Sequence, residues 1–474
     1  MDDISPTRLL LGALAAVLAI GILWVGKLNA TLKKTPPEVL AVSPHRWTEA
    51  EMRAVYDRIR AKPVDWASHL PPRATLAGGG DRRYIITGGS GGVGGTIVLH
   101  LLARGHPPEA LRIVDFRPPD RPELTTGAVA RVDFVRADIT SATGTTAAFD
   151  APWPAAVRDL PLTVFHTAAV ISHADRSMIT YERVRGVNVD GVRHVLDAAR
   201  AAGASVFVST SSASVAYRPV EYWGNPLRRW PRNYWQAIDE ADFARPLRPH
   251  PQFFGNYAYS KAVAERIIAE ANAPGFRTGI VRPANGIYGT TSTTDQIVGY
   301  CLRVGTFPSW IRNIIQNFVH AGNVSLGHLA FEAALLQDDR NGNMPKCAGQ
   351  AFTVTDDGPP TMFDDVYNLL KVIVATPPIK VIYLQPGLML VLAYVVELFD
   401  LASRLPVVGR IVPRPQGSLA MLQPAIFSAS TNHIATDTAA RRSVEDGGIA
   451  YRPLVSTMEG VCQQVLDWNI EHGK

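Results

Sequence analysis

The stretch YIITGGSGGVGGTIVLHLLARG, residues 84–105, decides the fold. An apolar strand pattern runs into a glycine-rich turn, and an apolar helical pattern follows directly. Gly88, Gly91 and Gly94 have the spacing G-x-x-G-x-x-G. Glycines at these positions let backbone amides and the positive end of a helix approach a pyrophosphate, where side chains would block it. The stretch therefore predicts a strand, a turn and a helix that bind a dinucleotide.

Strand and helix patterns continue to alternate after this unit. Short β-rich runs, LRIVD, VDFVRAD, LTVFHTAA and SVFVSTS, are separated by longer helical segments such as residues 187–202. The alternation predicts a doubly wound α/β fold with a parallel sheet and right-handed crossovers. Hydrophobic residues make up 47% of the chain, which excludes an intrinsically disordered protein. The net charge of +5 is small for 474 residues, so we expect no nucleic-acid partner.

An acidic residue ends the second predicted strand. Asp115 follows Gly94 by 115 − 94 = 21 positions, close to the roughly 20 expected for an acid that binds the adenosine ribose. A carboxylate there accepts hydrogen bonds from both ribose hydroxyls and repels a 2′-phosphate, which favours NAD over NADP. Arg117 lies two residues further on and could accommodate a phosphate, so NADP is the alternative.

The third and fourth predicted strands end in two further cofactor candidates. Asp138, in VRADIT, could reach the adenine amino group or be a solvated loop acid. Ala168, in VFHTAAV, is a small residue at a strand end where the cofactor backbone would pass closely. His166 in the same strand is expected to be a packed or hydrogen-bonded histidine, because the apolar strand leaves it little access to substrate.

The stretch GNYAYSKAVAER contains two tyrosines close to a single lysine. Tyr257 and Lys261 are four residues apart and share one face of a helix, whereas Tyr259 points elsewhere and is expected to pack. A nearby ammonium lowers the pKa of a phenol from about 10, which would make Tyr257 a usable base. The hydroxyl cluster in FVSTSSASV ends a predicted strand at the sheet edge where doubly wound folds bind ligands.

Taken in order, these motifs resemble an extended short-chain dehydrogenase/reductase. The chain is most similar to the group of 3β-hydroxysteroid dehydrogenase and sterol-4α-carboxylate 3-dehydrogenase (decarboxylating), over about residues 82–468. Besides the motifs above, the similarity includes VNVDGVRHVLDAA, TSSASV, RPANGIYG, NFVHAGNVSLGHL, GQAFTVTDDGPPTMFDD and YRPLVSTMEGVCQQVLDW.

The resemblance implies roles for individual residues. Ser212, the first residue of SASV, would be the catalytic serine, Tyr257 the acid/base, and Lys261 the ligand of the nicotinamide ribose. Asn188 would hold the helix and a proton-relay water. The implied cofactor contacts are Thr87, Gly88, Gly91, Val93, Gly94, Asp115, Asp138, Ile139, Ala168, Tyr257, Lys261 and Pro283. No metal is implied.

An uncharged run, LLLGALAAVLAIGILWV from Leu9 to Val25, is just long enough for a bilayer. It is longer than an ordinary signal-peptide core and no clear cleavage site follows, which favours an uncleaved anchor over a signal peptide. Lys27, Lys33 and Lys34 follow the run, and the positive-inside rule then places the body in the cytosol. The widely spaced cysteines indicate a reducing compartment. With the resemblance, this predicts a single-pass protein of the endoplasmic reticulum membrane.

Two segments depart from the pattern of the resembled group. Residues 218–236, RPVEYWGNPLRRWPRNYWQ, form a long aromatic and arginine-rich insertion. It is either an amphipathic flap beside the substrate entrance or an insertion that packs its own aromatic residues. The second segment, residues 381–401, is an apolar run that contains Pro386. We expect it to be a monotopic helix or a lid, because a second span would separate the C-terminal motif from its own domain.

Four regions are expected along the chain. These are the anchor (1–35), an amphipathic helix and linker (36–80), the NAD-binding Rossmann domain (81–290) and a smaller C-terminal substrate and lid region (291–474). Thr48 and Glu51 have the spacing of a capping box at the start of the amphipathic helix.

The leading functional hypothesis is NAD-dependent oxidation of the 3β-hydroxyl of a sterol or polycyclic terpenoid, with C4 decarboxylation of a 4-carboxysterol. A dehydrogenase or ketoreductase that tailors triterpenoids or meroterpenoids is the alternative on the same fold. A non-catalytic, membrane-bound NAD-binding scaffold is the alternative of another class. Sugar-nucleotide epimerases share these motifs, but the two apolar segments favour lipid substrates. The expected partners are the substrate and the lipid membrane, and a homodimer or a complex with other membrane-bound sterol enzymes is compatible with the sequence.

Overall fold

The computed structural model describes residues 6–72, 81–337 and 343–473. Most of the linker expected at the end of the region 36–80, residues 73–80, lies outside these ranges. The capping box predicted at the amphipathic helix is confirmed: Thr48 accepts a hydrogen bond from the Glu51 N–H (3.3 Å), and its own N–H donates to Glu51 Oε2 (2.7 Å). Helix α3 (Glu49–Ala61) follows.

A seven-stranded parallel sheet forms the centre of the molecule, in the order β12-β7-β5-β4-β1-β2-β3. The chain moves outward from β1 to β3 and then restarts on the other side of β1 with β4, which is the topological switch point of a doubly wound sheet. The predicted fold class is confirmed. The strands are β1 (Arg83–Thr87), β2 (Leu111–Asp115), β3 (Asp133–Arg136), β4 (Leu162–His166), β5 (Ala204–Thr210), β7 (Arg277–Pro283) and β12 (Ala351–Val354).

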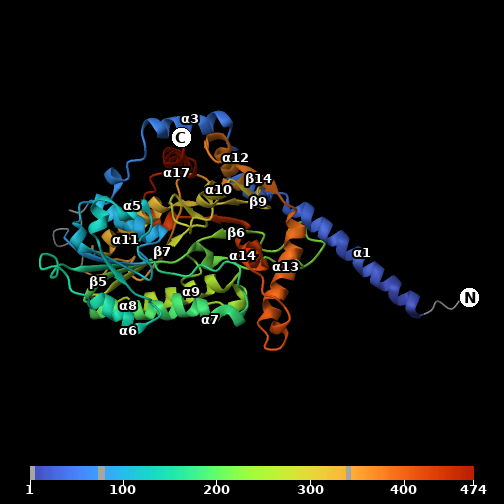
Figure 1. The fold of residues 1–474 in the computed structure, drawn as a ribbon, viewed down its shortest axis with the longest axis horizontal. Helices are drawn as coiled ribbons and strands as arrows, with labels where there is room; N and C mark the ends of the chain where they lie inside the picture. Colours follow the sequence, from blue (N-terminus) through green and yellow to red (C-terminus); the bar gives the residue numbers. More distant parts are fainter. Residues whose placement is uncertain (1–5, 73–80, 338–342, 474) are drawn as a thin grey trace, which may run out of the picture.

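Alternate residues of the strands bury against helices on opposite faces of this sheet. Ile86 lies in one apolar cluster with α4 and α11, and Ile85 lies in another with α6, α8 and α9. Figure 1 shows α6, α8 and α9 together on one side of the strands. These helices are α4 (Gly92–Ala103), α11 (Ala321–Leu335), α6 (Ala142–Asp150), α8 (Gly191–Ala201) and α9 (Asn256–Glu270).

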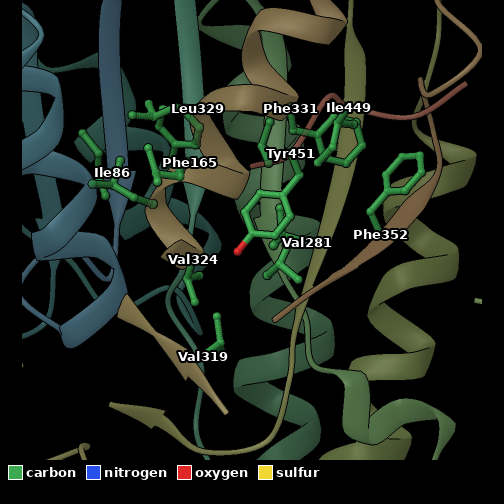
Figure 2. Close-up of a cluster of buried hydrophobic side chains, with 14 of the residues drawn as sticks. Ile86, Phe165, Val281, Val319, Val324, Leu329, Phe331, Phe352, Ile449 and Tyr451 are labelled. Atoms are coloured by element: carbon green, nitrogen blue, oxygen red, sulfur yellow. The ribbon is translucent and has the colours of Figure 1, made fainter. Parts of the chain in front are cut away.

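The cluster on the α11 side also holds residues from the end of the chain. Figure 2 shows Tyr451 beside Phe331, among side chains from the central strands. Tyr451 is fully buried, and its hydroxyl donates a hydrogen bond to the Thr355 carbonyl (2.8 Å). The C-terminal region is therefore packed into the core of the nucleotide-binding sheet.

A second apolar core joins the C-terminal region to the inner end of α1, to α3 and to the insertion at residues 218–236. The C-terminal region contains a four-stranded sheet in the order β13-β10-β15-β6 and the two-stranded sheets β11-β8 and β14-β9. The remaining strands are β6 (Trp235–Ile238), β8 (Ile287–Tyr288), β9 (Thr306–Ser309), β10 (Ile315–Gln316), β11 (Val319–His320), β13 (Thr361–Met362), β14 (Lys380–Tyr383) and β15 (Asn432–Ala435). The remaining helices are α2 (Pro37–Val42), α5 (Pro122–Thr125), α7 (Tyr181–Arg185), α10 (Val298–Val304), α12 (Phe363–Ile373), α14 (Gly417–Met421), α15 (Pro424–Ala429), α16 (Thr438–Arg441) and α17 (Thr457–His472).

The N-terminal apolar run forms helix α1 (Pro6–Leu32), which projects away from the body of the molecule (Figure 1). Its outer part exposes a series of large apolar side chains, and its last turns are buried at Leu28 and Leu32. By length and composition, α1 is apolar enough to cross a membrane.

The second apolar run does not form one helix as its pattern suggests. Its first residues belong to β14, which pairs with β9, and helix α13 (Pro386–Ser403) begins only at the proline. The physical reason is that proline lacks the N–H of a strand or helix interior but fits the first helical turn. Helix α13 buries a face that includes Leu390 and Ala393 and exposes the opposite face, with Leu388 and Leu398.

The aromatic insertion is not confined to the surface of its own domain. Tyr222 and Tyr234 are buried, and their hydroxyls donate to the carbonyls of Phe427 (2.8 Å) and Leu32 (3.2 Å). Its end forms β6, which pairs in parallel with β15. The self-contained packing suggested by the sequence is therefore wrong, because the aromatic residues fill a space between the C-terminal region and the base of α1.

Candidate active site

The glycine turn lies between β1 and α4 and has no room for side chains. Gly88 has φ +73°, and a Cβ there would lie 2.6 Å from the backbone nitrogen of Ala168. A Cβ on Gly94 would lie 2.4 Å from the Gly88 carbonyl oxygen. Gly91 caps α4, whose first turn contains Val93. This bare backbone at a helix N-terminus fits the pyrophosphate of a dinucleotide.

The Gly94→Ala substitution tests the turn. Because the added methyl overlaps the Gly88 carbonyl, the turn must shift, and we expect NAD affinity to fall at least tenfold (about 1.4 kcal/mol). Isothermal titration of the purified protein with NAD measures the change. Gly186→Ala is the control, since a Cβ there meets nothing within 4 Å. Equal affinities of the two variants would contradict the assignment of the turn.

Asp115 ends β2 beside this turn. Its carboxylate accepts hydrogen bonds from the backbone N–H groups of Ser90 (3.2 Å) and Arg117 (3.3 Å). Burial raises the pKa of Asp115, while these two N–H groups act in the opposite direction. The acid predicted to bind the ribose is thus held against the glycine turn by the main chain.

The other residues predicted on the adenine side of the cofactor are not bonded to the glycine turn as Asp115 is, in the part of the chain that the structure describes. Asp138 lies two residues beyond β3, is exposed, and accepts bonds from the N–H and hydroxyl of Thr140 (2.9 and 2.8 Å). Ile139 is buried and packs against Gly191 at the start of α8. His166 is buried, as predicted, and hydrogen-bonds the hydroxyl of Thr87 (2.7 Å). The structure shows no bond between Asp138 and the glycine turn in the parts of the chain it describes.

Tyr257 lies in the first turn of α9, beside the strand end that carries Ser212. The Ser212 hydroxyl lies beside the Tyr257 phenol, where it acts to lower the pKa of the phenol, and it is 2.8 Å from the Ser214 hydroxyl. The ring of His173 packs edge-on against Tyr257, with ring centroids 5.6 Å apart. Tyr259 contacts other aromatic rings, including Tyr181, as the packing role predicted for it requires. Helical spacing thus selected the tyrosine that faces the hydroxyl cluster.

Lys261 lies one turn further along α9 and is buried. Its ammonium donates to the Thr210 carbonyl at the end of β5 (2.7 Å), and burial lowers its pKa to about 8. The expected lowering of the tyrosine pKa is wrong for this structure. Burial raises the pKa of Tyr257 to about 12, against the hydrogen bond from Ser212. Desolvation dominates because the phenol is almost completely enclosed, and the Lys261 ammonium is directed at the Thr210 carbonyl instead.

Asn188 joins two elements around this site. Its side-chain amide exchanges two hydrogen bonds with the backbone of Val170, each 2.9 Å, in the loop after β4. It also donates to the Ser260 hydroxyl (3.0 Å), and Ser260 donates to the Tyr257 carbonyl (2.7 Å). Asn188 therefore fixes the loop after β4 against the helix that carries Tyr257.

Pro283 ends β7 at the same edge of the sheet and is buried opposite Val354. The ends of β1, β2, β4, β5 and β7 thus bring the glycine turn, Asp115, Ala168, Ser212 and Pro283 to one side of the molecule. In a doubly wound sheet this is the edge at which ligands bind.

A buried ionic network beneath Lys261 is absent from the sequence-based predictions. Arg282 on β7 donates two hydrogen bonds to Glu265 on α9 (2.8 and 2.6 Å) and two to Asp242 (2.8 and 3.4 Å). Glu265 also accepts from the Ser211 hydroxyl (2.6 Å). The one sequence signal was the position of Glu265, four residues after Lys261 on the same helical face.

The loop after β4 is also tied to helix α13. Arg176 forms a bidentate pair with Glu397 of α13, with both N–O distances 2.6 Å, and its guanidinium packs over the Tyr394 ring. Ile171, Met178 and Ile179 of the same loop are exposed. An apolar loop and an apolar helix therefore adjoin the region of His173 and Tyr257.

Comparison with protein-family models decides the family. The model described as 3-beta hydroxysteroid dehydrogenase/isomerase family matches residues 85–376, more than half of the chain. The chain belongs to the 3-beta hydroxysteroid dehydrogenase/isomerase family. This confirms the resemblance seen in the motifs, and it makes the chain an oxidoreductase of the steroid dehydrogenase type that uses a nicotinamide dinucleotide.

Individual members of the family are distant relatives of this chain. It is 29% identical over 302 residues to a 3 beta-hydroxysteroid dehydrogenase/Delta 5→4-isomerase of Mycobacterium tuberculosis, covering 61% of this chain and 69% of the relative. It is also 29% identical over 290 residues to the human 3 beta-hydroxysteroid dehydrogenase type 7, covering 60% and 70% of the two chains.

Solved structures share the fold of this 3-beta hydroxysteroid dehydrogenase/isomerase family member. An epimerase from Methanothermobacter thermautotrophicus has a TM-score of 0.54 at 16% identity, covering 84% of this chain and 95% of its own. The dTDP-glucose 4,6-dehydratase DesIV from Streptomyces venezuelae, solved with NAD and TYD, has a TM-score of 0.52 at 20% identity, covering 82% and 97%. At these identities the likeness concerns the fold alone.

Proposed function

We propose that the chain oxidises the 3β-hydroxyl of a sterol or a related polycyclic terpenoid to the 3-ketone, with NAD as the oxidant. The observation that carries the proposal is the Tyr257 phenol beside the Ser212 hydroxyl, at the strand edge that also presents the glycine turn and Asp115. Membership of a family of 3-beta hydroxysteroid dehydrogenases supports the position of the hydroxyl on the substrate. The Asp115 carboxylate supports NAD over NADP.

Oxidation removes two hydrogens from the substrate alcohol: the hydroxyl hydrogen leaves as a proton, and the hydrogen on the carbinol carbon leaves as a hydride. Ser212 and Tyr257 hold the substrate hydroxyl between them, and Tyr257 accepts its proton. Bound NAD supplies the acceptor for the hydride that leaves the carbinol carbon. A Lys261 pKa of about 8 keeps an ammonium available near neutral pH, where it would hold the nicotinamide ribose. Asn188 keeps the helix of Tyr257 aligned with the loop after β4.

The surroundings of the site favour a lipid-like substrate. The apolar loop residues Ile171, Met178 and Ile179 are exposed, and Arg176 ties this loop to α13, another face of which exposes apolar side chains. A large apolar alcohol that moves along such a surface keeps much of its own apolar surface out of water. Where the substrate carries a C4 carboxylate, the 3-ketone makes it a β-keto acid. Loss of CO₂ then needs little further help from side chains.

The proposed location is the endoplasmic reticulum membrane, with α1 as a single-pass anchor and the body in the cytosol. The exposed apolar side chains of α1 support anchoring, and Lys27 and Lys33 at its inner end support the orientation. Under this proposal α13 rests on the membrane with its exposed face, since its other face is buried in the protein.

A substrate panel tests the proposal. The purified protein is given NAD or NADP with 3β-hydroxysterols that do or do not carry a 4-carboxylate, with their 3α epimers as matched controls. We expect NADH absorbance to rise with the 3β alcohols only, and CO₂ release with the 4-carboxysterols. Turnover of a nucleotide sugar with no oxidation of any sterol or terpenoid alcohol would overturn the substrate assignment. Faster reaction with NADP would overturn the cofactor assignment.

A further inference from the structure

A cavity of about 250 Å³ lies between the inner end of α1 and the insertion at residues 218–236. None of its lining residues belongs to the glycine turn or to the Ser212 and Tyr257 site. Two tryptophans and four cations line much of it: Trp24, Lys27, Arg228, Arg229, Trp230 and Arg232. The cavity is thus a separate hollow in which the anchor helix and the insertion meet.

The charges around this cavity are unbalanced. Its single lining carboxylate, Glu221, pairs with Arg232 (3.2 Å). The Lys27 ammonium donates to the carbonyls of Pro226 and, more weakly, Arg228 (3.4 Å), which fixes its position but does not neutralise its charge. The side chains of Arg228 and Arg229 have no carboxylate partner within the described ranges of the chain. The cavity therefore attracts an anion.

The cavity lies next to the point on α1 where the run of exposed apolar side chains ends. The residues before it on this helix expose apolar side chains as far as Leu23, and Trp24 and Lys27 follow. Tryptophan and lysine mark the boundary between the hydrocarbon core and the headgroups at the end of a spanning helix. Trp24 packs edge-on against Trp223 of the insertion, with ring centroids 6.3 Å apart. The insertion therefore meets α1 where phospholipid phosphates would lie.

We propose that this cavity binds the phosphate-bearing headgroup of an anionic phospholipid. The guanidinium groups of Arg228 and Arg229 match the geometry of phosphate oxygens, and Lys27 adds a third charge. The acyl chains of the lipid lie along the apolar part of α1. The site rests on the proposed anchoring of α1 in a membrane, and it gives the insertion the role of a headgroup clamp. Zwitterionic lipids lack the net charge that the cavity requires.

Native mass spectrometry of the full chain in detergent micelles tests the site. The protein is titrated with dioctanoyl phosphatidylglycerol or dioctanoyl phosphatidylcholine, which have the same chains and differ in net charge. We expect a saturable adduct with phosphatidylglycerol only. The Arg228→Gln/Arg229→Gln variant should bind it about 30-fold more weakly, since each basic residue near a headgroup contributes a factor of about five.

The matched control is Arg53→Gln/Arg60→Gln on α3, where two exposed arginines are lost far from the cavity. It should bind phosphatidylglycerol as the wild type does. Equal adducts with both lipids, or equal affinity of the Arg228/Arg229 variant and the wild type, would overturn the site. Displacement by inorganic phosphate at the lipid concentration would assign the cavity to a free anion instead. Two further experiments use the same variants. Alkaline extraction of cell membranes tests whether α1 anchors the protein, and the NADH assay tests the dehydrogenase activity.

Discussion

Replacing Tyr257 with phenylalanine is expected to lower kcat/KM for alcohol oxidation by about 10²–10⁴-fold, the usual contribution of a positioned acid/base. The substitution removes the hydroxyl that meets Ser212 but keeps the ring that packs against His173. NAD binding should be largely unchanged, because the glycine turn and Asp115 are not touched. Steady-state NADH formation and titration of NAD against the variant measure the two quantities.

Tyr259→Phe is the matched control for this experiment. It lies on the same helix and loses the same atom, but its ring packs against Tyr181, His250 and Phe253 rather than Ser212. We expect kcat/KM within a factor of a few of the wild type. Retained activity in Tyr257→Phe, or an equal loss in both variants, would remove Tyr257 from the mechanism.

Replacing Arg282 with methionine is expected to have the largest effect on stability. Arg282 is buried and donates to Glu265 and Asp242, so its loss leaves the Glu265 carboxylate buried without this cation. Removing one partner of a buried ion pair typically costs about 3–5 kcal/mol of the free energy of unfolding. Urea denaturation in detergent, followed by tryptophan fluorescence, should show a lower midpoint.

The exposed pair of Arg193 and Asp190, 3.0 Å apart, provides the control. Arg193→Met should lower the free energy of unfolding by about 1 kcal/mol or less, because exposed ion pairs are well solvated in the unfolded and folded states alike. A similar midpoint for Arg282→Met and Arg193→Met would show that the buried network does not stabilise the fold. The contact between Arg282 and Glu265 would then not be what holds α9 against β7.

The parts of this molecule that could be predicted from sequence are those set by neighbouring residues. The strand that leads into Gly88 and the helix that follows Gly91 form one continuous pattern, and the seven-stranded parallel sheet follows from its repetition. The pairing of Tyr257 with Lys261 on one helical face needed only the period of a helix. Local spacing therefore yielded the fold class and the centre of the candidate site.

Features that depend on distant residues were missed. Arg282 meets Asp242 across 40 positions, and no local pattern indicates the contact. The pKa of Tyr257 was predicted in the wrong direction because burial of the phenol cannot be read from its helical neighbours. The two interpretations of the insertion could not be separated from sequence for a similar reason, since its strand β6 pairs with β15 almost 200 residues later in the chain.

The inner end of α1 determines where a soluble fragment of this protein can begin. Leu28 and Leu32 belong to the second apolar core, and Asn29 exchanges hydrogen bonds with Gln385 (3.0 Å) and the Gly387 N–H (2.9 Å). A truncation that removes all of α1 would expose apolar side chains of that core to solvent. It would also remove Asn29, the hydrogen-bond partner of the residues at the start of α13. A cut near Gly26 keeps these contacts and removes the exposed apolar turns together with Trp24. Under the proposed anchoring, α1 is therefore joined rigidly to the body of the molecule, and the useful truncation point lies inside a helix.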